Sequence, residues 1–491
     1  MAFQAPNADL LPRSTLIIGD SVEEQGSGDL LAHLYPGTNE VTREFRMGAP
    51  SDVDRAVEAA QAAFPAWRAM TGDKRRNLMF ALAALLEAES MNLAPILIAE
   101  NGSVAMTAGY MGFDGANKFR YCGGWADKLE GRTVPTWGGP AHDYVQYEPY
   151  GVVGVIVPWN GPIFAATMVL APALAAGNCI VIKAPDLAPY SVMRLVELIR
   201  QAGFPPGVVN LVTGGADVGA AMVSHPGIGK IEFIGSGTTA KKILASAAES
   251  LKPVGLELGG KSAVLVFADA NLQDAAKRGL SGAVSASGQG CVNGTRLLVE
   301  RSIYEPYVEM LKAMAGHIVV GDPFAKETMI GPVISEASLA RIQGMIQRGV
   351  EAGGRVVCGG AERLGGDHAG GNFLPLTVLA DVPADSEVFR TEVFGPVLAV
   401  TPFDSEEEAI ALANGTDYGL GAYVHTQNLA RAHRVAGQMM AGMVQVNGSG
   451  EGMTPCVPFG GMKHSGHGRL GGIEGIREFQ QVRNVWVNLQ G

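Results

Sequence analysis

A cysteine and a glutamate are the two side chains of this sequence best suited to covalent chemistry. Cys291 ends the stretch Ser-Gly-Gln-Gly-Cys, and Glu257 precedes it, between two leucines and just before Gly259 and Gly260. A thiolate is a strong nucleophile, and a nearby carboxylate can accept the proton in the step that releases a covalent intermediate. The pair therefore predicts an enzyme that works through a cysteine-bound intermediate.

The residues around Cys291 favour a reactive thiol. Gly288 and Gly290 let the backbone approach a ligand and leave N–H groups free, and Val292 leads toward an apolar strand at 296–299. Such N–H groups stabilise a thiolate. A cysteine taken by itself is more often a small buried hydrophobic side chain, and its neighbours are what favour the nucleophile here.

Two further polar residues end apolar strands. Glu257 is costly in an apolar run unless it is used or paired, and a salt bridge with Lys261 is the alternative to a catalytic role. Asn160 follows Pro158 and Trp159 at the end of the strand predicted at 152–157. An asparagine amide there can hold an oxyanion together with the backbone N–H of the cysteine, although asparagine is also common in turns.

A candidate dinucleotide site lies between these residues. A strand at 230–234 is followed by Gly235, Ser236 and the rest of a Gly-x-Gly-x-x-Ala motif, a context that places a pyrophosphate at a helix N-terminus. The acidic residue usual about twenty positions later is not evident. Lys183 and Asp186, at the end of an earlier strand, offer a cation and a carboxylate for ribose hydroxyls, and the alternative is an ordinary solvated turn.

The composition is that of a large globular α/β protein. The chain has 491 residues, 47% of them hydrophobic and 17% charged, with 66 glycines, so we expect two or three domains. The net charge of −11 is spread without a basic run, which disfavours nucleic acid as a partner. Residues 1–30 lack a signal-peptide pattern, and no apolar run has membrane-spanning length. With five cysteines, we expect a cytoplasmic protein without disulfides, membrane contacts or a metal site.

The elements that must position these residues form two sets. Helical spacing covers 51–63 and 73–89, with Ser51 and Asp73 as expected N-caps. From Tyr150 onward, strands alternate with helices, which predicts a parallel sheet covered on both faces. A second set starts near residue 263 and includes strands at 296–299, 355–358, 397–401 and 422–426 and helices at 304–316 and 335–352. Segments 143–147 and 485–489 are expected to be edge strands that pair with another domain or subunit.

In this order, the motifs resemble the aldehyde dehydrogenase superfamily from about Asp52 to Leu489. Three further blocks are similar to signatures of that family: Gly-Phe-Pro-Pro-Gly at 203–207, Glu-Val-Phe-Gly-Pro at 392–396, and Pro-Phe-Gly-Gly-Met-Lys at 458–463. The resemblance implies a Rossmann-like cofactor domain (1–133 and 152–257) and an α/β catalytic domain (258–450). It also implies bridging strands (134–151 and 470–491) and a loop (451–469) that returns to the active site, with assembly as a homodimer or homotetramer.

The resemblance assigns the roles as well. Cys291 is the implied nucleophile, Glu257 the base that activates water, and Asn160 an oxyanion donor. The implied cofactor is NAD, with NADP as an alternative, and the product is a carboxylic acid. The residues implied at the cofactor are Trp159, Lys183, Asp186, Gly235, Ser236, Glu392 and Phe394, and those implied at the substrate are Gly161, Ala165, Met168, Val292, Met453 and Phe459.

The chain departs from the family pattern at several positions. Gly161 replaces an aromatic residue, Asp186 replaces the glutamate usual in NAD users, and Val169 and Leu470 replace a lysine and a glutamate behind the base. Since the implied substrate positions are small or apolar, we expect a neutral apolar or aromatic aldehyde. The implied absence of the lysine and glutamate predicts slow release of the acid from Cys291.

Two other functions remain open from the sequence. One is a CoA-acylating semialdehyde dehydrogenase, in which thiolysis replaces hydrolysis, and the carboxylate at Glu257 argues against it. The other is a non-catalytic structural or binding protein on the same fold, and the complete set of Cys291, Glu257 and Asn160 argues against that.

Overall fold

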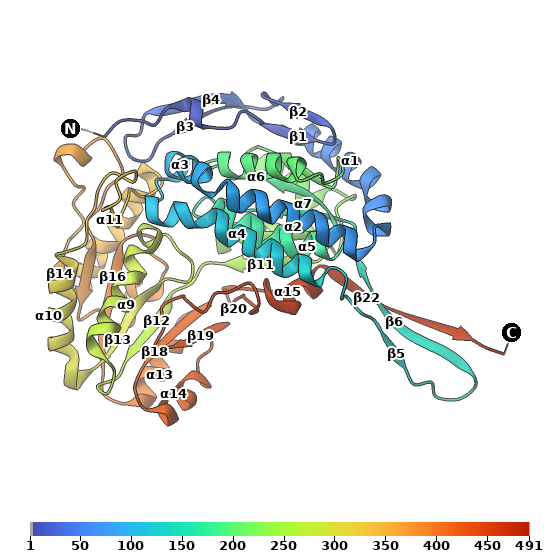
Figure 1. The fold of residues 1–491 in the computed structure, drawn as a ribbon. Helices are drawn as coiled ribbons and strands as arrows, with labels where there is room; N and C mark the ends of the chain where they lie inside the picture. Colours follow the sequence, from blue (N-terminus) through green and yellow to red (C-terminus); the bar gives the residue numbers. More distant parts are fainter. Residues whose placement is uncertain (1–2, 491) are drawn as a thin grey trace.

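The computed structural model describes residues 3–490 and is built around two sheets (Figure 1). The first sheet has eight strands in the order β2-β1-β9-β8-β7-β10-β11-β21. Its five strands from β9 to β11 run parallel, and β1, β2 and β21 complete its edges in antiparallel orientation. The bounds are β1 Leu16–Ile18, β2 Ser21–Glu23, β7 Val152–Ile156, β8 Cys179–Lys183, β9 Val209–Val212, β10 Lys230–Gly235, β11 Val254–Leu258 and β21 Gly466–His467.

Helices cover both faces of this sheet, as the alternating pattern predicts. The crossover helices are α5 Pro162–Ala175, α6 Tyr190–Gln201, α7 Ala216–Ser224 and α8 Gly237–Ala248, and the N-terminal helices are α1 Pro50–Ala69, α2 Gly72–Ala88, α3 Ser90–Asn101 and α4 Ala105–Trp125. The predicted caps are wrong by a few residues. Ala49 and Thr71 precede the helices, so Ser51 and Asp73 lie inside them. Pro50 explains the first shift, because proline is favoured at the first helical position.

The second sheet has seven strands in the order β14-β15-β16-β13-β12-β18-β19. All neighbours are parallel except β14, which runs antiparallel to β15 at the edge. The bounds are β12 Ser262–Val266, β13 Gly294–Glu300, β14 Arg355–Cys358, β15 Thr377–Ala380, β16 Val397–Phe403, β18 Gly421–His425 and β19 Met443–Val446. All five predicted strands of this set are present.

The two helices predicted at 304–316 and 335–352 are present beside the second sheet, as α10 and α11. The helices around this sheet are α9 Leu272–Val284, α10 Tyr304–Ala315, α11 Glu336–Glu351, α12 Glu387–Arg390, α13 Glu406–Asn414 and α14 Leu429–Ala436. Ser335 caps α11 by accepting a hydrogen bond from the N–H of Ser338. The predicted combination of a parallel cofactor-type sheet with a second α/β unit is confirmed.

A three-stranded arm projects from the body of the molecule (Figure 1). Its strands are β5 Arg132–Val134, β6 Ala141–Pro149 and β22 Gln480–Asn488, with β6 in the middle. Segment 143–147 is therefore the central strand of the arm and not the expected edge strand, and it pairs with the other segment in the register that places Trp486 opposite Asp143. Trp486 is 55% exposed, and Val482 is 68% exposed, so the arm presents apolar side chains to its surroundings.

The remaining elements join these parts. They are β3 Leu30–Leu34 and β4 Val41–Arg46, which form a hairpin, β17 Tyr418–Gly419 with β20 Met462–Lys463, and the short helix α15 Gly472–Glu478. Within residues 3–490, no single helix is long and apolar enough to cross a bilayer. Only α2 and α3 taken together would pass that test, and they are bent by 69° relative to each other.

Candidate functional site

Cys291 lies in a tight loop between α9 and β13. The turn Ser285–Gly288 before it contains Ala286 and Ser287 with positive φ values of 50° and 54°. Gly288 also has positive φ, and a Cβ there would lie 2.0 Å from the main-chain oxygen of Gly395. Only glycine permits that approach, so the glycines predicted to shape this loop bring it against the segment that follows Glu392.

Glu257 is the last residue but one of strand β11, at the carboxyl ends of the parallel strands of the first sheet. Its residue is 3% exposed, and neither carboxylate oxygen has a hydrogen-bond partner among the described residues. The alternative salt bridge is not formed, since the ammonium of Lys261 also lacks a hydrogen-bond partner within residues 3–490. Burial, followed by the charge of Glu232, raises the pKa of Glu257 well above its usual value, while Arg469 opposes the shift.

Asn160 follows β7 and reaches the loop that holds Cys291. Its Nδ2 donates to the main-chain oxygen of Gln289 over 2.7 Å. The preceding Trp159 is held in place by Asn101, whose Nδ2 donates to its main-chain oxygen over 3.0 Å. The structure thus brings the predicted oxyanion donor to the predicted nucleophile.

The thiol of Cys291 is hard to ionise in its surroundings. Burial raises its pKa to about 12, and the charges of Glu392 and Glu257 act in the same direction. The backbone N–H groups of Cys291 and Val292 act in the opposite direction. These N–H groups are the ones that stabilise a thiolate or an oxyanion once charge develops there.

The predicted ribose residues lie together at the carboxyl end of β8. Lys183 Nζ donates to Asp186 Oδ1 over 2.7 Å, and the two side chains are 9% and 37% exposed. At the end of β10, Ser236 caps α8 by accepting from the N–H of Thr239. A helix N-terminus of this kind attracts an anionic group such as a pyrophosphate.

The predicted nicotinamide residues, Glu392 and Phe394, lie beside the cysteine loop. Glu392 Oε1 accepts a hydrogen bond from the N–H of Gly260 over 3.0 Å, and a Cβ at Gly259 would lie 2.3 Å from its other oxygen. Phe394 has a positive φ of 51° and meets Trp159 edge to face, with ring centroids 5.5 Å apart. Together with the strand ends and the start of α8, these groups fit a dinucleotide that runs from β8 to Cys291.

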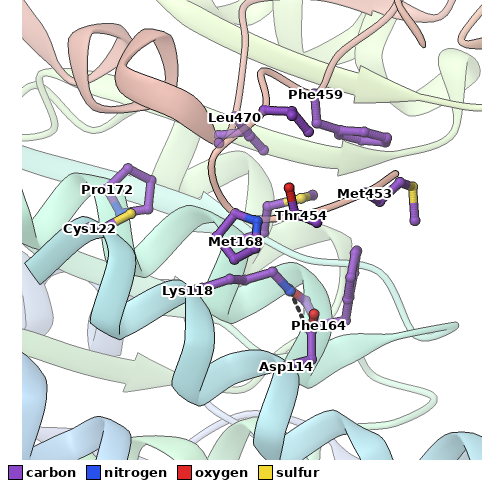
Figure 2. Close-up of a pocket in the computed structure, with 13 residues that line it drawn as sticks. Asp114, Lys118, Cys122, Phe164, Met168, Pro172, Met453, Thr454, Phe459 and Leu470 are labelled. Carbon is purple, nitrogen blue, oxygen red and sulfur yellow. Dashed lines mark hydrogen bonds and ion pairs between the residues drawn. The ribbon is translucent and has the colours of Figure 1, made fainter. Parts of the chain in front are cut away.

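A largely apolar cavity opens between α4, α5 and residues 453–471, which are called the late loop below (Figure 2). Three of the predicted substrate residues, Met168, Met453 and Phe459, line it. Val292 lines a second cavity, which it shares with Met453. Gly161 and Ala165 are not among the lining residues of either cavity within the described chain, and Gly161 is the residue before α5.

Two charged residues in the first cavity were not among the predicted site residues. Lys118 and Asp114 on α4 form an ion pair, and the ammonium also lies 3.6 Å from the ring centroid of Phe164 (Figure 2). Both residues are buried. A signal existed in the sequence, because an oppositely charged pair at i and i+4 interrupts a helix of small and apolar residues.

Val169 and Leu470, which stand where a lysine and a glutamate were expected behind the base, are both apolar residues of the protein interior. Both are fully buried, and Leu470 also lines the first cavity. Leu470 forms an isolated antiparallel bridge with Phe459. Neither side chain can carry a proton, so any proton that leaves Glu257 has to use other groups.

Comparisons with known proteins agree with this geometry. The model described as the aldehyde dehydrogenase family matches residues 22–485. The (Z)-2-((N-methylformamido)methylene)-5-hydroxybutyrolactone dehydrogenase of Acinetobacter baylyi is 38% identical over 459 residues, which cover 93% of each chain.

Solved structures show the same likeness. PnpE from a Pseudomonas species, in complex with nicotinamide adenine dinucleotide, matches with a TM-score of 0.95 at 38% identity over 98% of each chain. The betaine aldehyde dehydrogenase of Staphylococcus aureus, in complex with NAD+, matches with a TM-score of 0.95 at 31% identity, over 98% of this chain and 96% of that one. This chain therefore belongs to the aldehyde dehydrogenase family and is an NAD(P)-dependent enzyme of that class.

Proposed function

We propose that this enzyme oxidises a neutral aldehyde with an apolar or aromatic body to the carboxylic acid, through a thiohemiacetal and a thioester on Cys291. The observation that carries the proposal is the contact of the Asn160 amide with the Cys291 loop, at 2.7 Å from the oxygen of Gln289. An amide donor beside a cysteine N–H is what an oxyanion on the attacked carbon needs.

In the first half-reaction, the Cys291 thiolate attacks the aldehyde carbon and a C–S bond forms. The oxygen takes the electron pair of the former double bond and is held by Asn160 Nδ2 and the N–H of Cys291. NAD, when bound, supplies the acceptor for the hydride that leaves this carbon. The C=O bond then re-forms, and the acyl group stays on the sulfur as a thioester.

In the second half-reaction, Glu257 accepts a proton from a water molecule as that water attacks the thioester carbon. The C–S bond breaks, the acid leaves, and the sulfur departs as the thiolate. Glu257 then has to lose the proton before the next turnover. The Glu257 residue is only 3% exposed, and its carboxylate has no hydrogen-bond partner among the described residues. Loss of this proton is therefore the slow part of the proposed cycle.

The cofactor assignments follow from the same geometry. Lys183 and Asp186 would hold the adenosine ribose, and the capped start of α8 would receive the pyrophosphate. Glu392 and Phe394 would bound the nicotinamide end. We propose NAD as the preferred cofactor because the Asp186 carboxylate would repel the 2′-phosphate of NADP. The full set of proposed contacts is Trp159, Lys183, Asp186, Gly235, Ser236, Glu392 and Phe394.

The substrate class is supported by the lining of the first cavity. The cavity has an apolar wall, formed by Phe164, Met168, Met453, Phe459 and Leu470. The Lys118–Asp114 pair is neutral as a unit, because each charge is matched by the other. A neutral substrate body therefore fits this cavity better than an acid or a quaternary amine.

The larger organisation is proposed on similar grounds. Residues 1–133 and 152–257 would form the cofactor domain, and residues 258–450 would form the catalytic domain. Residues 134–151 and 470–491 would form the bridging arm, and residues 451–469 the loop that returns to the active site. The exposed apolar side chains of the arm support assembly as a homodimer or homotetramer. The five free cysteines support a cytoplasmic location.

One assay tests the proposed reaction directly. NADH formation is measured over a panel of aliphatic, aromatic, cationic and acidic aldehydes, with and without CoA, and the product is identified by mass spectrometry. We expect a free acid, the highest kcat/KM for apolar or aromatic aldehydes, and no activity in Cys291→Ser. The matched control Cys456→Ser, at an exposed cysteine, should retain activity. A CoA thioester as the main product, or activity in Cys291→Ser, would refute the proposal.

A further inference from the structure

A second buried glutamate lies one strand away from Glu257. Glu232 is on β10, is 2% exposed, and has a carboxylate oxygen without a hydrogen-bond partner among the residues described. The register pairs Glu232 with Gly255 and Ile234 with Glu257. Because side chains two residues apart on a strand share a face, Glu232 and Glu257 lie on the same face of the sheet.

Three glycines make room for carboxylates in this region. A Cβ at Gly255 would lie 2.1 Å from Glu232 Oε2, so the carboxylate of Glu232 extends over the strand that carries Glu257. A Cβ at Gly460 would lie 2.7 Å from Glu257 Oε1, and one at Gly468 would lie 3.2 Å from the carboxyl carbon of Glu478. The backbone is thus shaped around a cluster of three acidic groups.

Two cations accompany these three carboxylates. Lys230 on β10, 2% exposed, lies 2.7 Å from Glu478 on α15 and 3.6 Å from Glu232, with the ring of Tyr150 5.7 Å away. Arg469 faces Glu257 from the late loop, but its Nη1 donates to the main-chain oxygens of Gly461 and Gly468. The charge of Glu257 also acts on the thiol of Cys291.

Glu232 and Glu257 have different charged neighbours. Lys230 lies beside Glu232 and favours its ionised form, whereas Glu257 has no cation within salt-bridge distance among the described residues. Burial raises the pKa of Glu232 to about 7 despite Lys230. When Glu232 is ionised, its charge opposes the ionisation of Glu257.

We propose that Glu232 and Glu257 titrate as a coupled pair of carboxyl groups on one face of the sheet, with Glu232 as a positioning residue that sets the pH at which Glu257 becomes the ionised base. The inference rests on the proposed function of Glu257. Two close carboxyl groups titrate as a unit, and the second proton is lost only at higher pH than either group would need alone. Glu232 therefore delays ionisation of the base, and the delay appears in the step that needs the base, release of the acid from Cys291.

The test is the pH profile of kcat in Glu232→Gln. Glutamine keeps the shape of the side chain but removes the charge, so Glu257 should ionise more easily. We expect the rising limb of kcat to move to lower pH by about one unit, and kcat near pH 6 to exceed that of the native enzyme several-fold. Glu478→Gln should move the limb in the same direction by less, because Glu478 acts on Glu257 more weakly than Glu232 does. Glu474→Gln, at an exposed residue of the same helix, should leave it unchanged.

A purely structural role would give a different result. Loss of packing would lower kcat at all pH values and would not move the limb downward. An unchanged limb, or one displaced to higher pH, in a folded Glu232→Gln protein would overturn the proposal.

A second readout needs neither substrate nor cofactor. The infrared band of protonated carboxyl groups is followed against pH in the native protein, Glu232→Gln and Glu257→Gln. We expect the component that disappears in Glu257→Gln to titrate at lower pH in Glu232→Gln, and identical titrations would refute the coupling. An enzyme that lacks the proposed reaction would instead fail to oxidise aldehydes in its native form, so the two failures are distinguishable.

Discussion

The side-chain amide of Asn160 donates to the main-chain oxygen of Gln289, two residues before Cys291, over 2.7 Å. Gln289 is itself anchored, because its Oε1 accepts a hydrogen bond from the N–H of Ile334 over 3.0 Å. The loop that carries the nucleophile is therefore tied on one side to the end of β7 and on the other to the segment before α11. In the proposed mechanism, the Asn160 amide is thus positioned beside the nucleophile loop before any substrate arrives, and such preorganisation is how electrostatic stabilisation is most effective.

Replacing Asn160 with alanine should mainly affect the chemical steps. We expect kcat/KM to fall by about 10²–10³-fold, the usual cost of removing one oxyanion donor, while the Kd for NAD changes little. Stopped-flow measurement of the first turnover and fluorescence titration of the cofactor check the two parts. A kcat/KM within threefold of the native value would exclude Asn160 as a donor.

Release of the acid should limit turnover. Burial raises the pKa of Glu257 and so lowers the ionised share of the base relative to an ordinary carboxyl group, whereas hydride transfer does not need this carboxylate. Rapid mixing should show an NADH burst close to one per active site and a steady rate that rises toward alkaline pH. Glu257→Gln should keep the burst and lose the steady rate. The absence of a burst, with a deuterium isotope effect on kcat from deuterated aldehyde, would contradict this order of steps.

Asp186 should discriminate between the two cofactors. Its carboxylate is held by Lys183 at the proposed ribose site and is partly exposed, so its repulsion of a 2′-phosphate is reduced by solvent. We expect the native enzyme to prefer NAD, and Asp186→Ser to lower the ratio of kcat/KM for NAD over NADP by about tenfold. Asp385→Ser, which removes a carboxylate from an exposed loop, is the control. Equal or higher kcat/KM with NADP in the native enzyme would refute the assignment.

The ion pair in the substrate cavity should behave as one unit. Lys118→Met leaves Asp114 buried without its partner, and breaking a buried pair in this way costs about 3–5 kcal/mol in the free energy of unfolding. The double variant Lys118→Met/Asp114→Leu should recover most of that loss and keep kcat/KM for benzaldehyde within a few-fold. Denaturant unfolding of the three variants checks this. Equal losses in the single and double variants would show that the pairing is energetically unimportant.

Glu100 should make stability depend on pH. Burial raises the pKa of Glu100 to about 7, although Ser191 donates its N–H to the carboxylate over 2.9 Å. The folded state therefore binds the proton more tightly than the unfolded state. Its contribution is fully present at low pH and is lost as the pH rises toward and through 7, by about 3 kcal/mol in total. Glu100→Gln should flatten the dependence of the unfolding free energy between pH 5 and 8, measured by denaturant titration, and an unchanged slope would contradict the linkage.

The sequence predicts the scaffold of the site better than its electrostatics. The alternating β-branched runs locate β7 and β10, predicted at 152–157 and 230–234, to within one residue, because each buried strand has a composition distinct from the helices. The motifs also identify Cys291, Glu257 and Asn160, which the fold brings to one place.

The missed features depend on long-range packing. Lys118 and Asp114 look like an ordinary helical surface pair until α4 is packed against α5 and the late loop. Glu232 looks like the outward residue of a strand until β11 and α15 enclose it. The charge pair on α4 is visible in the sequence, but the burial of these charged groups is decided by other segments that pack on them, such as α5 and the loop before α15 for Lys118 and β11 and α15 for Glu232.

The first sheet is completed by a segment that lies about two hundred residues further along the chain than the strand it covers. β21 pairs with β11 at Glu257, and β22 pairs with β6 of the arm. Until those residues emerge, the edge of β11 is unprotected and two strands of the arm lack their third partner, a situation that favours aggregation of nascent chains. Synthesis that stops shortly after residue 460 would therefore yield a chain in which the catalytic carboxylate lies on an open sheet edge. The two-residue strand β21 thus closes the edge of the sheet at Glu257, so a change that unpairs residues 466–467 would expose this buried carboxylate without altering the strand that carries it.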